Sequence, residues 1–165
     1  MKAIVAVDAE WGIGRDNKLL FSVPEDMKFF RETTIGKVIV VGRKTLESFP
    51  GGKPLPRRTN LVLTTKGKID GVVTVADIDA LMREIGGFSS EDIFVCGGAS
   101  VYRTLLPFCD GALVTKIDAV GGADAFFPNL DEEKGWKLVS ESEVKESGGY
   151  KIKFCGYVNE HPRKP

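Results

Sequence analysis

Short runs of apolar and β-branched residues recur along the chain and predict the strands of a sheet. Several runs contain no polar residue that could face solvent, which is typical of strands buried on both faces of a mostly parallel sheet. The predicted strands cover residues 3–7, 38–41, 61–63, 72–75, 93–95 and 112–117.

Segments with a helical spacing of apolar residues lie between these strands. We expect helices over residues 24–33, just after Gly42, over 77–85 with Asp77 as the N-terminal cap, and over 99–106 before Pro107. Strands that alternate with helices indicate an α/β domain.

The end of the chain has a different pattern. Residues 137–143 and 150–158 alternate apolar and polar side chains around Ser147-Gly148-Gly149, which predicts an antiparallel hairpin added to the sheet. Residues 9–23 and 49–58 show no regular pattern and are expected to be long loops. Loops of this length in a small domain are commonly binding loops, so we expect residues 9–23 to include a closing lid.

Composition narrows the class of protein. The 165 residues, 42% of them hydrophobic, suffice for one buried core, so we expect one domain over residues 1–159 and a disordered tail over 160–165. The 23 basic and 23 acidic residues cancel without long runs of one sign, which argues against nucleic acid or a membrane surface as a partner. No apolar run approaches the ~18 residues of a membrane span, and the first is too short for a signal peptide. The expected partner is a small molecule.

Cysteine and histidine usage excludes several kinds of chemistry. Cys96, Cys109 and Cys155 are odd in number and lack CxxC spacing, which argues against a disulfide framework and a zinc site and favours the cytoplasm. The single histidine, His161, lies in the tail, so we expect neither a Ser-His or Cys-His nucleophile pair nor any metal site. A carboxylate becomes the leading candidate for catalysis.

Asp26 is that candidate. Pro24 suits the first turn of a helix, and Asp26 then shares a face with Met27 and Phe30. A carboxylate among apolar side chains loses hydration that only a cation or a hydrogen-bond donor replaces, and a substrate could be that partner. The alternative is that Asp26, like Glu25, only complements the helix dipole.

Two predicted strand-to-helix junctions have features of an anion site. Gly42 is followed by Arg43, Lys44 and Thr45, and a second strand ends in Gly97-Gly98. The alternative is that the glycines only form tight turns and that Arg43 and Lys44 are solvated surface charges. The GxGxxG motif is absent, because Asn17 stands where a third glycine after Gly12 and Gly14 would be needed. A P-loop is absent because the sequence contains neither GxxxxGKS nor GxxxxGKT.

Six motifs spread from about residue 3 to residue 158 together resemble the dihydrofolate reductases. Each is weak alone, but their common order and spacing make the resemblance specific. They are residues 12–14 (GIG), 24–26 with Phe30 (PED), 41–48 (VGRKTLES), 53–60 (KPLPRRTN), 97–102 (GGASVY) and 115–118 (TKID). The resemblance implies a central, mostly parallel eight-stranded sheet with flanking helices, and a monomer. It implies reduction of 7,8-dihydrofolate to tetrahydrofolate with NADPH, which serves one-carbon metabolism and thymidylate and purine synthesis.

The resemblance also implies roles for individual residues. Asp26 would pair with the pterin N3 and 2-amino groups, Thr115 would support it, and Arg58 would grip the glutamate α-carboxylate. The other implied substrate residues are Ile4, Met27, Phe30, Arg31 and Phe49. The implied cofactor residues are Ala6, Ile13, Gly14, Lys18, Leu19, Gly42, Arg43, Lys44, Thr45, Leu63, Thr64, Thr65, Cys96, Gly97, Gly98, Ala99, Ser100, Val101 and Tyr102.

One departure from the family pattern concerns Phe21, which stands where the family commonly has Trp. Phe lacks the indole N–H that helps to hold a water beside the pterin, so we expect a slower or more pH-sensitive enzyme. Two alternatives remain at this point: an NADPH-dependent reductase of the riboflavin pathway, which resembles the same fold, and a pterin- or nucleotide-binding module without activity.

Overall fold

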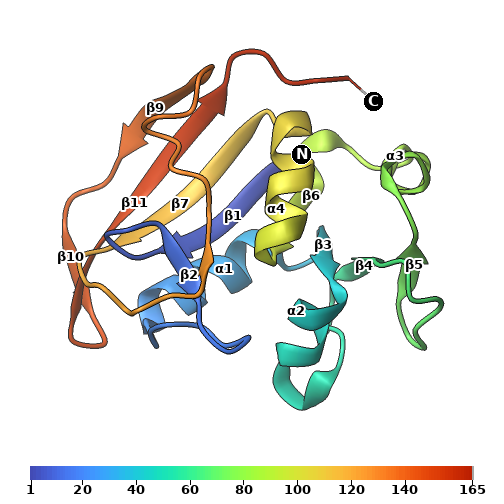
Figure 1. Cartoon of the computed structure of the whole chain (residues 1–165), viewed down its shortest axis with the longest axis horizontal. Helices are drawn as coiled ribbons and strands as arrows, with labels where there is room; N and C mark the ends of the chain where they lie inside the picture. The colour runs from blue at the N-terminus through green and yellow to red at the C-terminus, as the bar shows by residue number, and fades with distance from the viewer. Residues whose placement is uncertain (165) are drawn as a thin grey trace.

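A twisted central sheet organises the chain, and its strands follow the order β10-β11-β7-β1-β6-β3-β4-β5 in the computed structural model, which describes residues 1–164 (Figure 1). The strands of this path are β1 Lys2–Val7, β3 Val38–Gly42, β4 Thr59–Leu63, β5 Val73–Val75, β6 Ile93–Gly97, β7 Gly111–Ile117, β10 Lys145–Ser147 and β11 Tyr150–Asn159. Neighbours from β7 to β5 are parallel, and β11 runs antiparallel to β7. The predicted mostly parallel α/β sheet is confirmed.

The edge of the sheet at β11 is formed by two short strands. β9 Trp136–Glu141 pairs with residues 155–159 of β11, and β10 pairs with residues 150–152, so the two share one edge position and the sheet has eight positions. The prediction of one continuous strand over 137–143 is wrong at its end. Between the end of β9 and the start of β10, Phe154 N donates to Ser142 Oγ over 2.9 Å, so a side chain takes the hydrogen bond of this strand position.

The helices cover both faces of the sheet. They are α1 Pro24–Thr34, α2 Arg43–Ser48, α3 Ile78–Ile85 and α4 Ala99–Leu105, with 3₁₀ turns at Pro50–Gly52, Ser90–Asp92 and Leu106–Phe108. Asp77 caps α3 as predicted, since its Oδ1 accepts from Ala80 N over 2.8 Å. The helix predicted over 99–106 stops at Leu105, and Pro107 lies in the 3₁₀ turn that follows.

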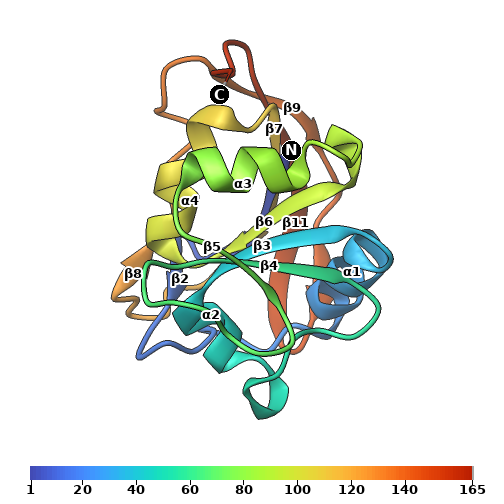
Figure 2. The same cartoon turned by 90° about the vertical axis from the view of Figure 1, so that its right-hand side faces the viewer.

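Two hydrophobic layers separate the helices from the sheet. Leu81 of α3 and Leu105 of α4 are fully buried in the main core, against the face that carries Val5 and Val95. The opposite face packs against α1 and α2, where the Phe29 and Phe154 rings lie 4.8 Å apart. Figure 2 shows α3 and α4 on one side of the sheet and α1 and α2 on the other.

The segment predicted as a loop over residues 9–23 contains regular structure. β2 Gly12–Gly14 pairs with β8 Ala125–Phe126 in a separate two-stranded sheet, and Arg15 and Lys18 form a further bridge. The prediction of an irregular segment is therefore wrong here, because the partner of β2 lies more than a hundred residues away and leaves no local signal. Residues 49–58 are irregular apart from one 3₁₀ turn.

The C-terminal segment lies against the body of the protein. The backbone N–H groups of Glu160 and Arg163 donate to Gly135 O and Pro107 O, each over 2.8 Å, where the sequence predicts a disordered tail over 160–165. Position 165 of that prediction lies outside the described residues. No helix in residues 1–164 is long and apolar enough to cross a membrane.

Candidate active site

Asp26 in the first turn of α1 is held against the sheet by Thr115 of β7. Thr115 Oγ1 donates to Asp26 Oδ1 over 2.6 Å. Burial raises the pKa of the Asp26 carboxyl, and the hydrogen bond from Thr115 opposes that shift. The side chain therefore points towards the sheet, which a role restricted to the helix dipole would not require.

A small pocket, the Asp26 pocket, surrounds this carboxylate. Its volume is about 30 Å³. The lining residues are Ala6, Asp8, Gly12, Ile13, Leu19, Leu20, Phe21, Val23, Asp26, Met27 and Ile117. Most of the wall is apolar, so a donor group of a bound ring would meet Asp26 with little competition from water.

A longer cleft, the Gly97 cleft, continues from this pocket, because Ala6, Ile13 and Leu19 line both. Its volume is about 190 Å³. It is lined by Val5, Ala6, Ile13, Gly14, Asn17, Lys18, Leu19, Thr45, Ser48, Cys96, Gly97, Gly98, Ala99, Tyr102, Asp124 and Ala125. Eleven of the predicted cofactor residues are among these, brought together from β1, the segment after it, α2, β6 and α4.

Gly97 and Gly98 leave the floor of this cleft open. A Cβ atom added at Gly98 would lie 3.2 Å from Thr45 Oγ1, and Gly97 has a φ of 126°, which side chains rarely adopt. The neighbouring Cys96 is a wall residue, since burial raises its pKa far above the usual range of a thiol and keeps it protonated. A ligand can thus approach bare backbone here.

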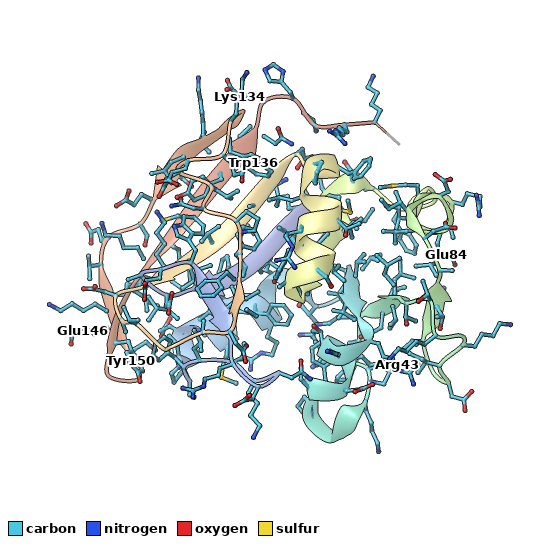
Figure 3. The ribbon with its side chains drawn as sticks, viewed as in Figure 1. Arg43, Glu84, Lys134, Trp136, Glu146 and Tyr150 are labelled. Atoms are coloured by element: carbon cyan, nitrogen blue, oxygen red, sulfur yellow. The ribbon has the colours of Figure 1, made fainter. Side chains whose placement is uncertain are left out.

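The remaining predicted cofactor residues lie outside the cleft wall. Arg43, labelled in Figure 3, is the half-buried first residue of α2. Its Nε lies 3.2 Å from Glu47 Oε1, whereas Lys44 is exposed. Gly42 and Val101 pack on each other: a Cβ at Gly42 would lie 3.0 Å from Val101 Cγ2. The others are Leu63 and Thr64, which are half-buried at the end of β4, and Thr65 and Ser100, which are exposed.

A hairpin turn covers one side of the cleft, and we call residues 14–19 the lid. Asp16 and Asn17 have φ values of 52° and 60° between the paired Arg15 and Lys18, as a type I′ turn requires. Asn17 Nδ2 donates to Lys44 O in α2 over 2.9 Å, so the tip of the lid spans the cleft.

Asp124 contacts the lid at two points. Its Oδ2 accepts from Asp16 N over 3.0 Å, and its own N–H donates to Gly14 O over 3.0 Å. Sequence reasoning missed both Asn17 and Asp124 as lid contacts. Asn17 offered one usable signal, because Asn tolerates the left-handed conformation that such turns need.

Arg58 lies near the C-terminal half of α1. Its Nε donates to Thr34 Oγ1 over 2.9 Å, its Nη1 donates to Pro56 O over 2.8 Å, and its guanidinium carbon lies 6.0 Å from the centre of the Phe30 ring. Partial burial lowers the pKa of Arg58, yet a guanidinium remains charged. The side chain is fixed by two protein acceptors, and Thr34 is a support that sequence reasoning missed.

The other predicted substrate residues are dispersed. Ile4 is buried in β1, and its carbonyl accepts from Tyr102 Oη over 2.6 Å, so its main chain orients Tyr102. Phe49 is half-buried and Arg31 is exposed, while Met27 is 57% exposed although it borders the Asp26 pocket. Phe21, the departure from the family pattern, packs against Tyr150, the first residue of β11 (labelled in Figure 3), with the two ring centres 4.7 Å apart.

A larger cavity of about 390 Å³ lies near Trp11 and Lys116, away from the predicted cofactor residues. Three of its lining residues are in ion pairs: Lys116 Nζ lies 3.0 Å from Asp131 Oδ2, and Lys153 Nζ lies 2.6 Å from Glu141 Oε1. Volume alone does not indicate the active site here, because neither Asp26 nor any of the other predicted site residues lines this cavity.

Comparison with known proteins identifies the family. The family model described as dihydrofolate reductase matches residues 1–159. The dihydrofolate reductase of Bacillus subtilis is 36% identical over 165 residues, which covers 98% of this chain and 95% of that protein. The dihydrofolate reductase of Neisseria meningitidis serogroup B is 34% identical over 149 residues, 88% of this chain and 90% of the relative. A solved dihydrofolate reductase from Enterococcus faecalis, complexed with NADP(H) and RAB-propyl, superposes with a TM-score of 0.83 at 33% identity, over 95% of this chain and 94% of that one. The chain belongs to the dihydrofolate reductase family.

Proposed function

We propose that this chain carries out the reaction of its family, the NADPH-dependent reduction of 7,8-dihydrofolate, with Asp26 as the residue that binds the pterin ring. The observation that carries the assignment to Asp26 is that Thr115 holds its side chain by a hydrogen bond while Asp26 lines an apolar pocket that shares wall residues with the Gly97 cleft. A carboxylate held at this junction can bind one heterocycle while a second lies alongside.

The Gly97 cleft fits a dinucleotide. Bare backbone at Gly97 and Gly98 admits phosphate oxygens without steric conflict, and Arg43 and Lys44 supply positive charge nearby. Ala6 and Ile13, at the shared wall of pocket and cleft, would border the nicotinamide through their backbone groups. When bound there, NADPH supplies a hydride from nicotinamide C4 to pterin C6.

Asp26 prepares the pterin for this transfer. Its carboxylate would accept hydrogen bonds from N3 and the 2-amino group, which replace the water that the pocket excludes. The C6=N5 bond of the pterin accepts hydride poorly until N5 is protonated, and the negative charge of Asp26 favours that protonated form without contact with N5. Water that reaches N5 past the lid would deliver the proton.

Arg58 and the lid provide orientation. The Arg58 guanidinium, fixed by Thr34 and Pro56, would bind the α-carboxylate of the glutamate part of the substrate. The lid, tied to α2 through Asn17, would exclude bulk water from the two rings. Correct placement of two flat rings supplies much of the rate of such a reaction.

We infer that the protein works as a monomer in the cytoplasm. All residues proposed for the site come from one chain, and the three cysteines are free thiols. A pool of reduced folate for one-carbon transfer, and hence for thymidylate and purine synthesis, would be its product. Size-exclusion chromatography at increasing protein concentration tests the monomer.

The decisive experiment follows NADPH oxidation by the purified protein with and without 7,8-dihydrofolate. We expect consumption of NADPH only when dihydrofolate is present, and little or none with Asp26→Asn. Turnover by Asp26→Asn equal to that of the unchanged protein would show that Asp26 does not carry the reaction. Failure of the unchanged protein to oxidise NADPH at any concentration would overturn the proposed activity itself.

A further inference from the structure

Asp8, which directly follows β1, joins two segments that are distant in sequence. Its side chain is buried, with 4% of the residue exposed. Oδ1 accepts from Glu10 N over 2.9 Å and from Gly12 N over 2.7 Å, while Oδ2 accepts from Gly121 N over 3.0 Å. One carboxylate thus accepts hydrogen bonds from two neighbouring segments: the one that leads into β2 and the one that precedes β8.

Nothing but backbone N–H groups compensates for the burial of this carboxylate. No Lys, Arg or His in residues 1–164 forms an ion pair with Asp8. A buried carboxylate is tolerated when several donors satisfy its oxygen atoms, and each donor that is lost leaves an uncompensated polar group. The geometry around Asp8 is therefore sensitive to any separation of the two segments.

One of the two segments continues into the lid, and the other contacts the lid a few residues further on. On one side, Gly12 begins β2, which continues into residues 14–19. On the other side, two residues separate Gly121 from Asp124, whose side chain accepts from Asp16 N in the lid. The segments are also in close contact, since a Cβ atom added at Gly12 would lie 2.5 Å from Ala123 Cβ.

We propose that Asp8 is a positioning residue that keeps the lid closed over the Gly97 cleft by fastening the segment of Glu10 and Gly12 to the segment of Gly121. This inference rests on the proposed function, because the lid acts on a cofactor bound in that cleft. The Asp8 side chain makes no hydrogen bond to residues 14–19, so its effect on the lid passes through β2 and Asp124.

The Asp8→Asn variant isolates the link between the segments. With its carbonyl oxygen in the place of Oδ1, Asn still accepts from Glu10 N and Gly12 N, and its NH₂ group then faces the Gly121 N–H, donor against donor. Asp118→Asn is the matched control, because Asp118 is exposed, precedes the same segment and makes no side-chain hydrogen bond among the described residues.

The test measures release of NADPH from the binary complex by stopped-flow fluorescence, together with the dissociation constant of dihydrofolate. For Asp8→Asn we expect release of NADPH about tenfold faster, the scale of one lost hydrogen bond, and binding of dihydrofolate changed by less than about twofold. Asp118→Asn should match the unchanged protein in both. Since Asp8 also borders the Asp26 pocket, the dihydrofolate measurement separates an effect on that pocket from an effect on the lid.

Unchanged release of NADPH in Asp8→Asn would overturn the proposal. Equal weakening of both ligands together with a lower melting temperature would also overturn it, because that result describes a general structural role. Hydrogen exchange in the unchanged protein gives an answer even if the variant fails to fold: NADPH should slow exchange of the Gly12 and Gly121 amides together, and unaffected exchange contradicts the proposal. These measurements need no turnover, so they are independent of whether the protein reduces dihydrofolate.

Discussion

The Thr115 hydroxyl donates to Asp26 Oδ1 over 2.6 Å and so connects the middle of β7 to the first turn of α1. The two residues are 89 positions apart, and only the packing of α1 against this face of the sheet brings them together. The bond leaves Asp26 Oδ2 for a ligand and prevents the carboxylate from rotating towards solvent. A fixed acceptor is what recognition of two parallel N–H donors requires.

Replacement of Asp26 by Asn should reduce activity and increase stability. We expect turnover at neutral pH to fall by at least about a hundredfold, with partial recovery in acid, where N5 is protonated without help. We expect the melting temperature of the ligand-free variant to rise by about 2–4 °C, since a buried carboxylate is removed. Steady-state assays across pH and thermal melts measure the two effects.

The pH dependence of that stability gain has a definite sign. The folded-state pKa of Asp26 lies above its ordinary value of 3.8 because of burial, so the contribution of this group to stability is present below that value and is lost as the pH rises through the folded-state pKa. The difference in melting temperature between variant and unchanged protein should therefore grow from about pH 4 to pH 8. A difference that shrinks over this range would contradict the burial of the carboxylate.

Replacement of Thr115 by Val should weaken the use of dihydrofolate and leave the use of NADPH unchanged. The lost hydrogen bond opposes the shift caused by burial, so the pKa of Asp26 should rise further and the acid limb of dihydrofolate binding should move to higher pH. We expect KM for dihydrofolate to increase about tenfold and KM for NADPH to stay nearly constant. Thr115→Ser retains the hydroxyl and serves as the control, and a pH profile of kcat/KM is the measurement.

Replacement of Arg58 by Leu should weaken the binding of dihydrofolate by about 2–4 kcal/mol, because a charge-assisted pair with the α-carboxylate is lost. NADPH should bind nearly as before. Arg57→Leu is a matched control, since Arg57 is adjacent in sequence but exposed. Isothermal titration with each ligand distinguishes the cases, and equal losses for both ligands would mean that Arg58 does not face the substrate.

The hydrogen bond from Asn17 to Lys44 O should hold the cofactor in place. Asn17→Gly removes this bond and still permits the φ of 60°, whereas Asn17→Ala removes the bond and also strains the turn. We expect NADPH to leave Asn17→Gly up to about tenfold faster, with little change in melting temperature. Asn17→Ala should in addition melt at a lower temperature. Release rates like those of the unchanged protein in both variants would show that this contact does not limit opening of the lid.

Local sequence was sufficient to predict most elements and insufficient to predict the contacts that join them. The cap at Asp77, the buried runs of β3 and β6 and the hairpin turn at Gly148-Gly149 follow from neighbours within a few positions, and these predictions are confirmed. The break between β9 and β10 and the pairing of β2 with β8 depend on partners far along the chain. No periodicity within a segment reports such a partner.

By itself, the sequence determined an α/β domain, the family and the residue types of the site, because these depend on local hydrophobic pattern and on motif order. Only the tertiary structure decided that Asp26 points to Thr115 and that Thr34 fixes Arg58. It also decided that Asp8 binds the Gly121 N–H and that Asp124 binds the Asp16 N–H in the lid. Each of these contacts joins residues whose sequence separation is between 24 and 113 positions. Such bonds form only after the sheet has brought the elements together, so their geometry is a property of the packed chain.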